Sequence, residues 1–248
     1  RYPPPADLAA HANVTSADLT VAAADPEAFW AEQAKRISWS TDPTETLDWT
    51  NPPFAKWFAD GTLNAAYNCV DRHVDNGLGE RIAIYFEGEP GDERQLTYAQ
   101  LKDEVCRAAN GLASLGVKTG DRVAIYLPMI PEAVISMLAC ARLGAIHTVI
   151  FGGFSADALS TRINDCGVEV VITADGGYRR GAPSPLKPAV DRALEHTPGV
   201  RQVVVVKRTG QDTAMVEGRD QWWDDVIATQ PTTHTPEMFA AEHPLFVM

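Results

Sequence analysis

Two short glycine-containing segments hold the residues best suited to binding an anionic ligand. The first, Phe151-Gly152-Gly153-Phe154-Ser155, follows an apolar run and precedes a helical pattern. Its glycines allow a ligand to approach the backbone closely, and the start of a helix offers free N–H groups to an anion. A tight turn is the more common use of paired glycines, so this segment alone is a weak indication of a site.

The second segment contains adjacent arginines. Ala174 to Gly181 follows another apolar run, and Arg179 and Arg180 within it could bind a phosphate or stack on an adenine ring. No acidic residue occurs between positions 176 and 190, a stretch that also contains Lys187, although the chain has a net charge of −12. We therefore expect a local basic pocket here, with a solvated surface loop as the alternative.

Other common catalytic and metal-binding patterns are absent from the sequence. It has no G-x-x-x-x-G-K-[ST] phosphate loop, no G-x-G-x-x-G after a strand and no serine elbow. The 4 cysteines form no C-x-x-C pair and have no histidine nearby at zinc-ligand spacing, so we expect no metal site. Cys106 and Cys140 fall in apolar helical patterns and should be buried, inert thiols.

The composition is that of an ordinary globular protein, and a polyanionic small ligand would need a local basic pocket. The chain has 248 residues, of which 45% are hydrophobic and 22% charged. The net charge of −12 excludes general binding to nucleic acid or anionic membranes, because such partners need a basic face. No apolar run approaches the roughly 18 residues of a membrane span, and residues 1–10 lack the order of a signal peptide. We expect a cytoplasmic protein.

From Arg81 onward, apolar strands alternate with helices. A hairpin (82–87 with 94–97) and a helix that begins with the Thr97/Gln100 capping box and ends at Gly116 come first. Strands are then predicted at 122–127, 147–151, 168–173 and 202–206, and helices at 131–143, 155–166, 186–196 and about 221–228. This order is typical of an α/β fold with a mostly parallel sheet flanked by helices. Ligands bind beyond the carboxyl ends of such strands, so the loops 128–130, 152–154 and 174–185 could face one crevice.

Residues 1–78 have a different character. They contain four of the 6 tryptophans and only short helical patterns, so we expect an irregular, helical wrapping segment before the α/β domain at 79–248. Asp25-Pro26 predicts the start of a helix that runs to about Ile37, and a second helix is expected at 63–73. The aromatic residues between these helices are expected to pack rather than to bind a ligand: Trp49, Phe54, Trp57 and Phe58.

Five stretches of the sequence carry a specific family resemblance. They are FWAEQAKRISW (29–39), KWFADGTLNAAYNCVDRHV (56–74), LTYAQL (96–101), GDRVAIYLPMIPEAVISMLACARLGAIHTVIFGGFS (120–155) and VVITADGGYRRG (170–181). They closely resemble AMP-forming acetyl-CoA synthetases of the adenylate-forming superfamily, and LTYAQL is similar to the first core motif of that superfamily. The resemblance implies part of the large N-terminal domain of an acetate-CoA ligase. Such a ligase joins acetate to AMP, releases pyrophosphate and passes the acetyl group to coenzyme A.

The same resemblance assigns the two glycine-containing segments to coenzyme A. In this family the loop that matches Phe151-Gly152-Gly153 lies against the adenine of coenzyme A, and the arginine that matches Arg179 stacks on that adenine near its 3′-phosphate. The expected binding residues also include Arg180 and Gly181. Many members have a second basic residue where this chain has Ala182, and Arg180 is the expected replacement.

The resemblance places the adenylation chemistry outside the sequence. The residues for ATP with its Mg²⁺, the acyl pocket and the catalytic lysine are expected after Met248, so we expect no catalytic residue in this chain. The expected partners are acetate, ATP, coenzyme A and the remainder of the same chain, with no nucleic acid and no membrane. The alternatives are a propionyl-CoA or acetoacetyl-CoA ligase, or a non-catalytic module that binds coenzyme A or an adenine nucleotide.

Residues 1–248 alone should not form an acyl-adenylate, because nothing in their sequence is suited to hold a triphosphate. We expect the purified 248-residue chain to give no acetate-dependent exchange of pyrophosphate into ATP above a protein-free blank. Exchange above the blank would contradict the prediction that the nucleotide site lies outside this segment.

Overall fold

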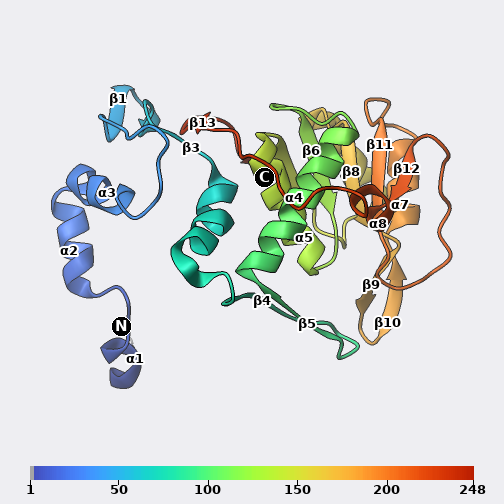
Figure 1. Ribbon diagram of the computed structural model, residues 1–248, viewed down its shortest axis with the longest axis horizontal. Coiled ribbons are helices and arrows are strands. Elements are labelled where there is room, and N and C mark those ends of the chain that lie inside the picture. The colour runs from blue at the N-terminus through green and yellow to red at the C-terminus, as the bar shows by residue number, and fades with distance from the viewer. Residues whose placement is uncertain (1–2) are drawn as a thin grey trace. The chain divides into compact units, whose positions relative to one another are not determined.

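The computed structural model describes residues 3–248, which divide into two compact units (Figure 1). The smaller unit comprises the chain up to Leu63 together with Ala240–Glu242. The larger unit comprises Asn64–Phe239 and His243–Met248.

The smaller unit begins with three short helices, α1 (Ala6–Ala10), α2 (Ser16–Ala24) and α3 (Pro26–Ala34). The predicted start of α3 is confirmed, because the Asp25 carboxylate accepts a hydrogen bond of 3.0 Å from the backbone N–H of Ala28. The helix ends before the predicted Ile37. The indole Nε1 of Trp39 donates to the carbonyl oxygen of Ala34 at 3.0 Å, which satisfies a carbonyl group at the end of the helix.

Aromatic side chains pack within the smaller unit, around its short strands β1 (Leu47–Asn51), β2 (Phe54–Trp57) and β3 (Thr62–Leu63). Ring centroids lie 6.4 Å apart for Trp30 and Trp57, and 6.1 Å apart for Trp57 and Phe58. The predicted packing role is therefore confirmed for Trp57 and Phe58. The side chains of Trp49 and Phe54 are 53% and 70% exposed, so a packing role is not confirmed for them.

The larger unit opens with a wide helical segment and a hairpin. The helix predicted at 63–73 is present as two π-helical turns, η1 (Tyr67–Asp71) and η2 (Val74–Leu78), and it extends past the predicted end. The hairpin is confirmed as β4 (Ile82–Glu87) and β5 (Glu93–Thr97), which pair antiparallel with Tyr85 opposite Gln95.

A six-stranded sheet forms the centre of the larger unit, and all its strand pairs are parallel. The spatial order is β12-β11-β8-β6-β7-β14. Its strands are β6 (Arg122–Tyr126), β7 (Ile146–Val149), β8 (Val170–Ala174), β11 (Gln202–Val206), β12 (Asp220–Trp222) and β14 (Phe246–Val247). All five residues of β8 are buried, which explains the uninterrupted apolar run in the sequence. The predicted parallel sheet is confirmed.

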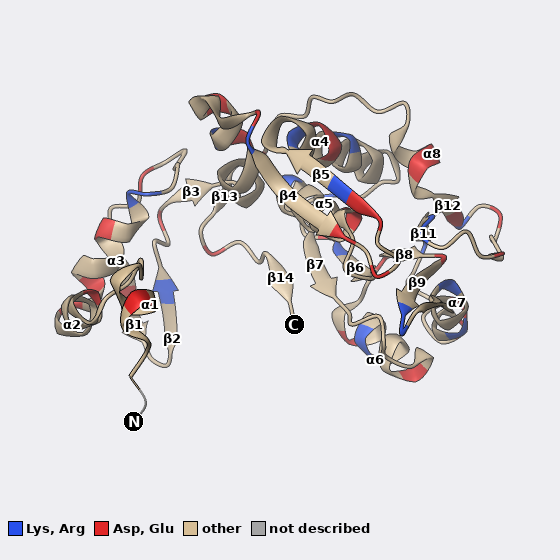
Figure 2. Cartoon of the chain, turned by 90° about the horizontal axis from the view of Figure 1, so that it is seen from below, with Lys and Arg blue, Asp and Glu red and all other residues tan. Residues whose placement is uncertain are grey.

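Helices cover both faces of this sheet (Figure 2). One face is covered by α4 (Tyr98–Ser114), α5 (Pro131–Leu143) and α8 (Trp223–Ile227), and the other by α6 (Ala156–Cys166) and α7 (Lys187–Leu194). The predicted caps are present, since Thr97 accepts from the N–H of Gln100 at 3.2 Å and Ser155 accepts from that of Ala158 at 3.3 Å. No helix among residues 3–248 is long and apolar enough to cross a membrane.

Two segments differ from the prediction. The expected loop at 174–185 contains a hairpin, β9 (Gly176–Arg179) with β10 (Ala182–Pro185). Its turn is made by Arg180 and Gly181, whose φ angles of 56° and 77° are both positive, as a tight two-residue hairpin turn requires. At 220–222 a short strand replaces the start of the helix predicted at about 221, because Asp220 pairs with Val203 at the edge of the sheet.

A buried ion pair joins the wide helical segment to α5. The Arg142 guanidinium donates to both carboxylate oxygens of Asp71, at 2.6 and 3.0 Å, and also to the carbonyl oxygen of His234. The side chains of Arg142 and Asp71 are only 1% and 5% exposed. Lys102 lies 3.6 Å from the same carboxylate. Together these contacts link α4, α5 and η1, and losing Arg142 would leave the buried Asp71 carboxylate with only the more distant Lys102 as a cationic partner.

Replacement of Arg142 by methionine should destabilise the full-length protein by about 3 to 5 kcal/mol, because the Asp71 carboxylate would stay buried without its bidentate partner. Urea denaturation measures the change. Arg192→Met on the exposed side of α7 is the matched control and should change stability by about 0.5 kcal/mol or less. Equal effects of the two substitutions would contradict a role of the buried pair in stability.

Candidate functional site

A cavity of about 440 Å³ lies at the carboxyl ends of the central strands in the larger unit. It is formed by residues that follow β6 and β7 and by the β9–β10 hairpin that follows β8: Leu127, Pro128, Met129, Val149, Ile150, Phe151, Gly152, Gly153, Gly177, Tyr178, Arg179, Ser184 and Leu186. Its volume is in the range of small-molecule sites. The three loops predicted to face one crevice therefore do so.

The strand order explains why these three loops meet. Strand β6 lies between β8 and β7, with Val123 opposite both Val170 and His147. The loop after β6 is therefore between the two glycine-containing segments. Pro128 and Met129, which the sequence marked only as part of a loop, become the middle of the cavity wall.

A buried tyrosine contacts backbone carbonyl groups of the glycine loop after β7. The Tyr126 hydroxyl lies 3.2 Å from the carbonyl oxygen of Gly152 and 3.0 Å from that of Phe154, and its one hydrogen can be donated to either. Tyr126 is 1% exposed, and this burial raises the pKa of its hydroxyl. Phe151 is instead 64% exposed and presents an open ring at the cavity. Sequence reasoning missed Tyr126, which appeared only as the end of an apolar strand.

The hairpin after β8 supplies the cationic wall. Gly177 allows β9 to pass close to the loop after β6, because a Cβ atom there would lie 3.2 Å from the side chain of Pro128. Arg179, at the exposed end of β9, lines the cavity, and no residue between 3 and 248 forms an ion pair with it. Arg180 and Gly181 form the hairpin turn and are not among the residues that line the cavity.

Lys187 does not contribute to a basic pocket, so that part of the prediction is wrong. Its side chain is 0% exposed, and its Nζ lies 2.7 Å from carboxylate oxygens of both Asp191 and Asp220. Arg219 joins the same cluster at 2.7 Å from Asp191 and 2.5 Å from Asp220. Of the basic residues in the acid-free stretch, Lys187 is therefore neutralised by Asp191 on the same helix and by Asp220, whereas Arg179 is not.

The wall of the cavity combines apolar surface with one unpaired guanidinium. Rings and aliphatic side chains such as Phe151 and Met129 suit a flat heterocycle, and Arg179 suits stacking on it or binding a phosphate beside it. No nucleophile with an adjacent base lines this wall. The arrangement can bind and orient an aromatic, anionic ligand, and its lining residues offer no covalent chemistry.

Groups of metal ligands are not found in the part of the chain that the structure describes, and two of the four cysteines are buried. Residues 3–248 contain no group of three or more His, Cys, Asp or Glu side chains that could hold a metal ion. Cys106 and Cys140 are buried, as predicted, and burial raises the pKa of the Cys140 thiol to about 12. That thiol is therefore protonated and unreactive at neutral pH.

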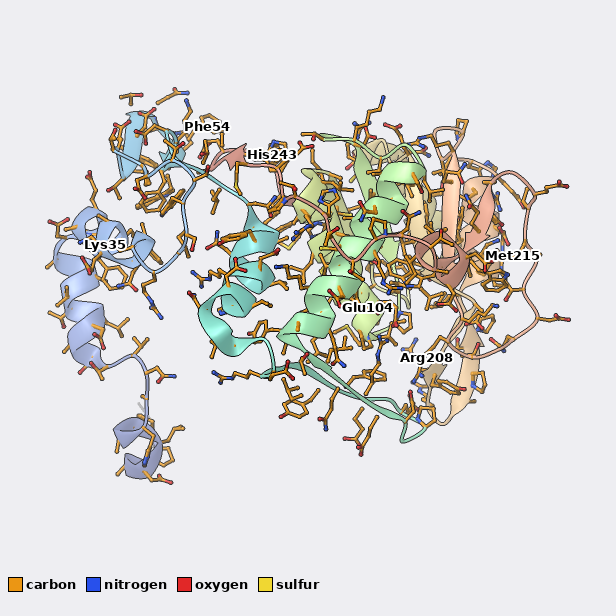
Figure 3. The ribbon with its side chains drawn as sticks, viewed as in Figure 1. Lys35, Phe54, Glu104, Arg208, Met215 and His243 are labelled. Atoms are coloured by element: carbon orange, nitrogen blue, oxygen red, sulfur yellow. The ribbon has the colours of Figure 1, made fainter. Side chains whose placement is uncertain are left out.

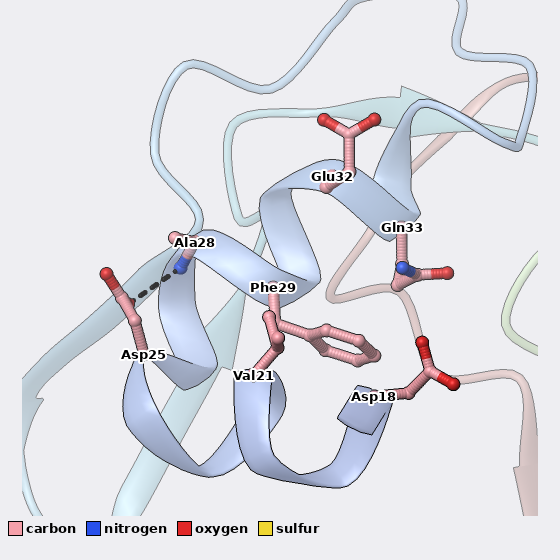
Figure 4. A pocket seen from close by; sticks show the side chains of 7 residues that line it. All are labelled: Asp18, Val21, Asp25, Ala28, Phe29, Glu32 and Gln33. Carbon is pink, nitrogen blue, oxygen red and sulfur yellow. Dashed lines mark hydrogen bonds between the residues drawn. The ribbon is translucent and has the colours of Figure 1, made fainter. Parts of the chain in front are cut away.

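A second hollow, of about 330 Å³, lies between α2 and α3 in the smaller unit (Figure 4). Its acidic side chains already have structural partners. Asp18 binds Thr15 at the start of α2, Asp25 binds the N–H of Ala28, and Glu32 pairs with Lys35 at 2.5 Å. We therefore assign these carboxylates to helix capping and surface pairing rather than to a ligand.

Comparisons with known proteins identify the family of the chain. Residues 70–248 match the family model of the AMP-binding enzymes, and residues 17–69 match that of the acetyl-coenzyme A synthetase N-terminus. The chain is 66% identical over 248 residues to an acetyl-coenzyme A synthetase of Streptomyces avermitilis and 58% identical over 250 residues to one of Mycobacterium tuberculosis. These matches cover 100% of this chain but 38% of each relative. The chain belongs to the family of AMP-binding enzymes.

Proposed function

We propose that this chain is the N-terminal part of an AMP-forming acetate-CoA ligase, and that its cavity holds the adenine end of coenzyme A. The ligase would convert ATP, acetate and coenzyme A to acetyl-CoA, AMP and pyrophosphate through acetyl-adenylate. The observation that carries the coenzyme A assignment is the cavity that joins the exposed ring of Phe151 to the unpaired guanidinium of Arg179. The names of the relatives support the reaction.

The residues of the cavity have distinct proposed roles. Phe151, Gly152 and Gly153 form the wall against which the adenine lies, and Arg179 stacks on its other side near the 3′-phosphate. Arg180 and Gly181 form the turn that ends β9, and Arg180 adds positive charge for that phosphate. Ala182 offers no such charge, so Arg179 carries most of the anion recognition.

The remaining parts of the reaction are proposed for the rest of the full-length protein. ATP with its Mg²⁺, the acetate pocket and the catalytic lysine would be supplied by segments outside residues 1–248. For the domain organisation we propose a wrapping segment at 1–78 and the first part of the ligase domain at 79–248. The boundary of the two family matches, at 69 and 70, supports a division in this region.

Replacement of Arg179 by alanine in the full-length protein should raise the KM for coenzyme A about tenfold or more. The expected size follows from losing a charge-assisted contact of about 1.5 to 3 kcal/mol, since about 1.4 kcal/mol corresponds to a factor of ten. Acetate-dependent exchange of pyrophosphate into ATP should stay unchanged, because that half-reaction precedes attack by the thiol. Steady-state kinetics with varied coenzyme A and a separate exchange assay measure the two effects.

Arg180→Ala is the matched control for this experiment, because Arg180 lies one residue away and does not line the cavity. It should raise the KM for coenzyme A by a smaller factor. An equal fall of exchange and of thioester formation in Arg179→Ala would mean that the residue supports folding or adenylation. No change in either reaction would leave Arg179 as a surface residue and would refute the proposed site.

Tyr126→Phe should raise the KM for coenzyme A roughly twofold to tenfold, because the loop at 152–154 would lose a hydrogen bond of about 0.5 to 1.5 kcal/mol. The exchange reaction should again be unaffected. Tyr85→Phe is the control, since Tyr85 is 75% exposed on β4. An unchanged KM in Tyr126→Phe would show that the buried hydroxyl does not determine the shape of the cavity.

A further inference from the structure

The β4–β5 hairpin contacts the β9–β10 hairpin, which carries Arg179, although the two are far apart in the sequence. Arg208, two residues after the end of β11, lies where the two hairpins approach each other (Figure 3). The contacts come from two carboxylates in and beside the turn of the first hairpin, Glu89 and Asp92. Neither residue lines the cavity.

The first contact runs through Arg208. Its guanidinium donates to both carboxylate oxygens of Asp92, at 2.5 and 2.9 Å, and lies 5.4 Å from the ring centroid of Phe86 on β4. The same guanidinium lies 5.1 Å from the ring centroid of Tyr178, the residue before Arg179 on β9. These distances suit cation–π contact. Arg208 therefore joins one hairpin to the other through a bidentate pair and two rings.

The backbone of Arg208 is also fixed. Its N–H donates at 2.8 Å to the buried carboxylate of Asp175, which lies between β8 and β9 and also accepts from the N–H groups of Gly176 and Gly210 at 2.7 Å each. The ends of β8 and β11 and the start of β9 are thus tied to one carboxylate. The guanidinium of Arg208 extends from this rigid base.

The second contact runs through Glu89. Its carboxylate accepts a hydrogen bond from the backbone N–H of Gly181, in the turn of the β9–β10 hairpin. Arg180 and Gly181 both have positive φ angles, 56° and 77°. The Glu89 carboxylate therefore binds the turn that follows Arg179. Tyr178, the residue before Arg179, is in contact with Arg208.

We propose that the β4–β5 hairpin is a positioning element for coenzyme A binding, and that Asp92 through Arg208, together with Glu89, holds Arg179 at the cavity. The inference rests on the proposed coenzyme A site. Residues on both sides of Arg179 are fixed by this hairpin, while the Arg179 side chain itself stays free for the ligand. Loss of either carboxylate should weaken coenzyme A binding without touching adenylation.

Gly88 provides an independent probe of the same contact. A Cβ atom at this position would overlap the Asp92 carboxylate and the end of the Arg208 side chain. The φ angle of Gly88 is not positive, so alanine fits the backbone and perturbs the ion pair instead. Gly88→Ala should therefore reproduce the effect of Asp92→Ala.

The test measures the KM for coenzyme A and the acetate-dependent pyrophosphate exchange of the full-length protein. Asp92→Ala, Glu89→Ala and Gly88→Ala should each raise the KM about threefold or more, with exchange unchanged. Glu87→Ala is the matched control, because this exposed carboxylate on β4 forms no ion pair among residues 3–248. The KM of this variant for coenzyme A should equal that of the unsubstituted protein. In an Arg179→Ala background, Asp92→Ala should have almost no further effect on the KM.

The double substitution separates positioning from general stability. If Asp92→Ala raises the KM by the same factor with and without Arg179, the two residues act independently and the inference is overturned while the coenzyme A site stands. An effect of Glu87→Ala as large as that of Asp92→Ala would also overturn it. If Arg179→Ala alone leaves the KM unchanged, the proposed site and the positioning role fail together.

Discussion

The parallel pairing of β8, β6 and β7 is the constraint on which the rest of the structure depends. Because these strands run in the same direction and pair in register, their carboxyl ends open at one edge. The loops after β6 and β7 and the hairpin after β8 then have to share that edge, and the cavity forms between them. Helices cover both faces of the sheet, so a ligand can approach it at the carboxyl ends of the strands.

Local patterns were sufficient to predict most of the larger unit. The capping residues Thr97 and Ser155 and the buried run of β8 have local causes, so their elements lie close to where the sequence places them. The errors occur at an uncommon local turn and at a strand that depends on a distant partner. The hairpin β9–β10 needs two consecutive positive φ angles, and β12 exists because Asp220 meets Val203 across the sheet.

In the candidate site, too, features with local causes could be predicted, and features that depend on distant residues could not. Glycines beside an exposed aromatic residue and an arginine after a strand are visible as types and spacings, and Phe151 and Arg179 do line one cavity. Charge along the chain was a poor guide to charge in space, because Lys187 is neutralised by Asp191 and Asp220. The hydroxyl of Tyr126 could not be predicted to support the glycine loop, since that contact spans 26 residues and no local pattern marks it.

Hydrogen exchange of the full-length protein, followed by mass spectrometry with and without coenzyme A, tests the proposed site most directly. Amide groups in the loop at 151–155 and in the hairpin at 176–185 should exchange more slowly when coenzyme A is bound, because the ligand would close the cavity between them. The amide groups of α2 and α3 in the smaller unit serve as the internal reference, and their exchange rates should not change. Slower exchange confined to segments outside the cavity would contradict the assignment of this edge of the sheet to coenzyme A.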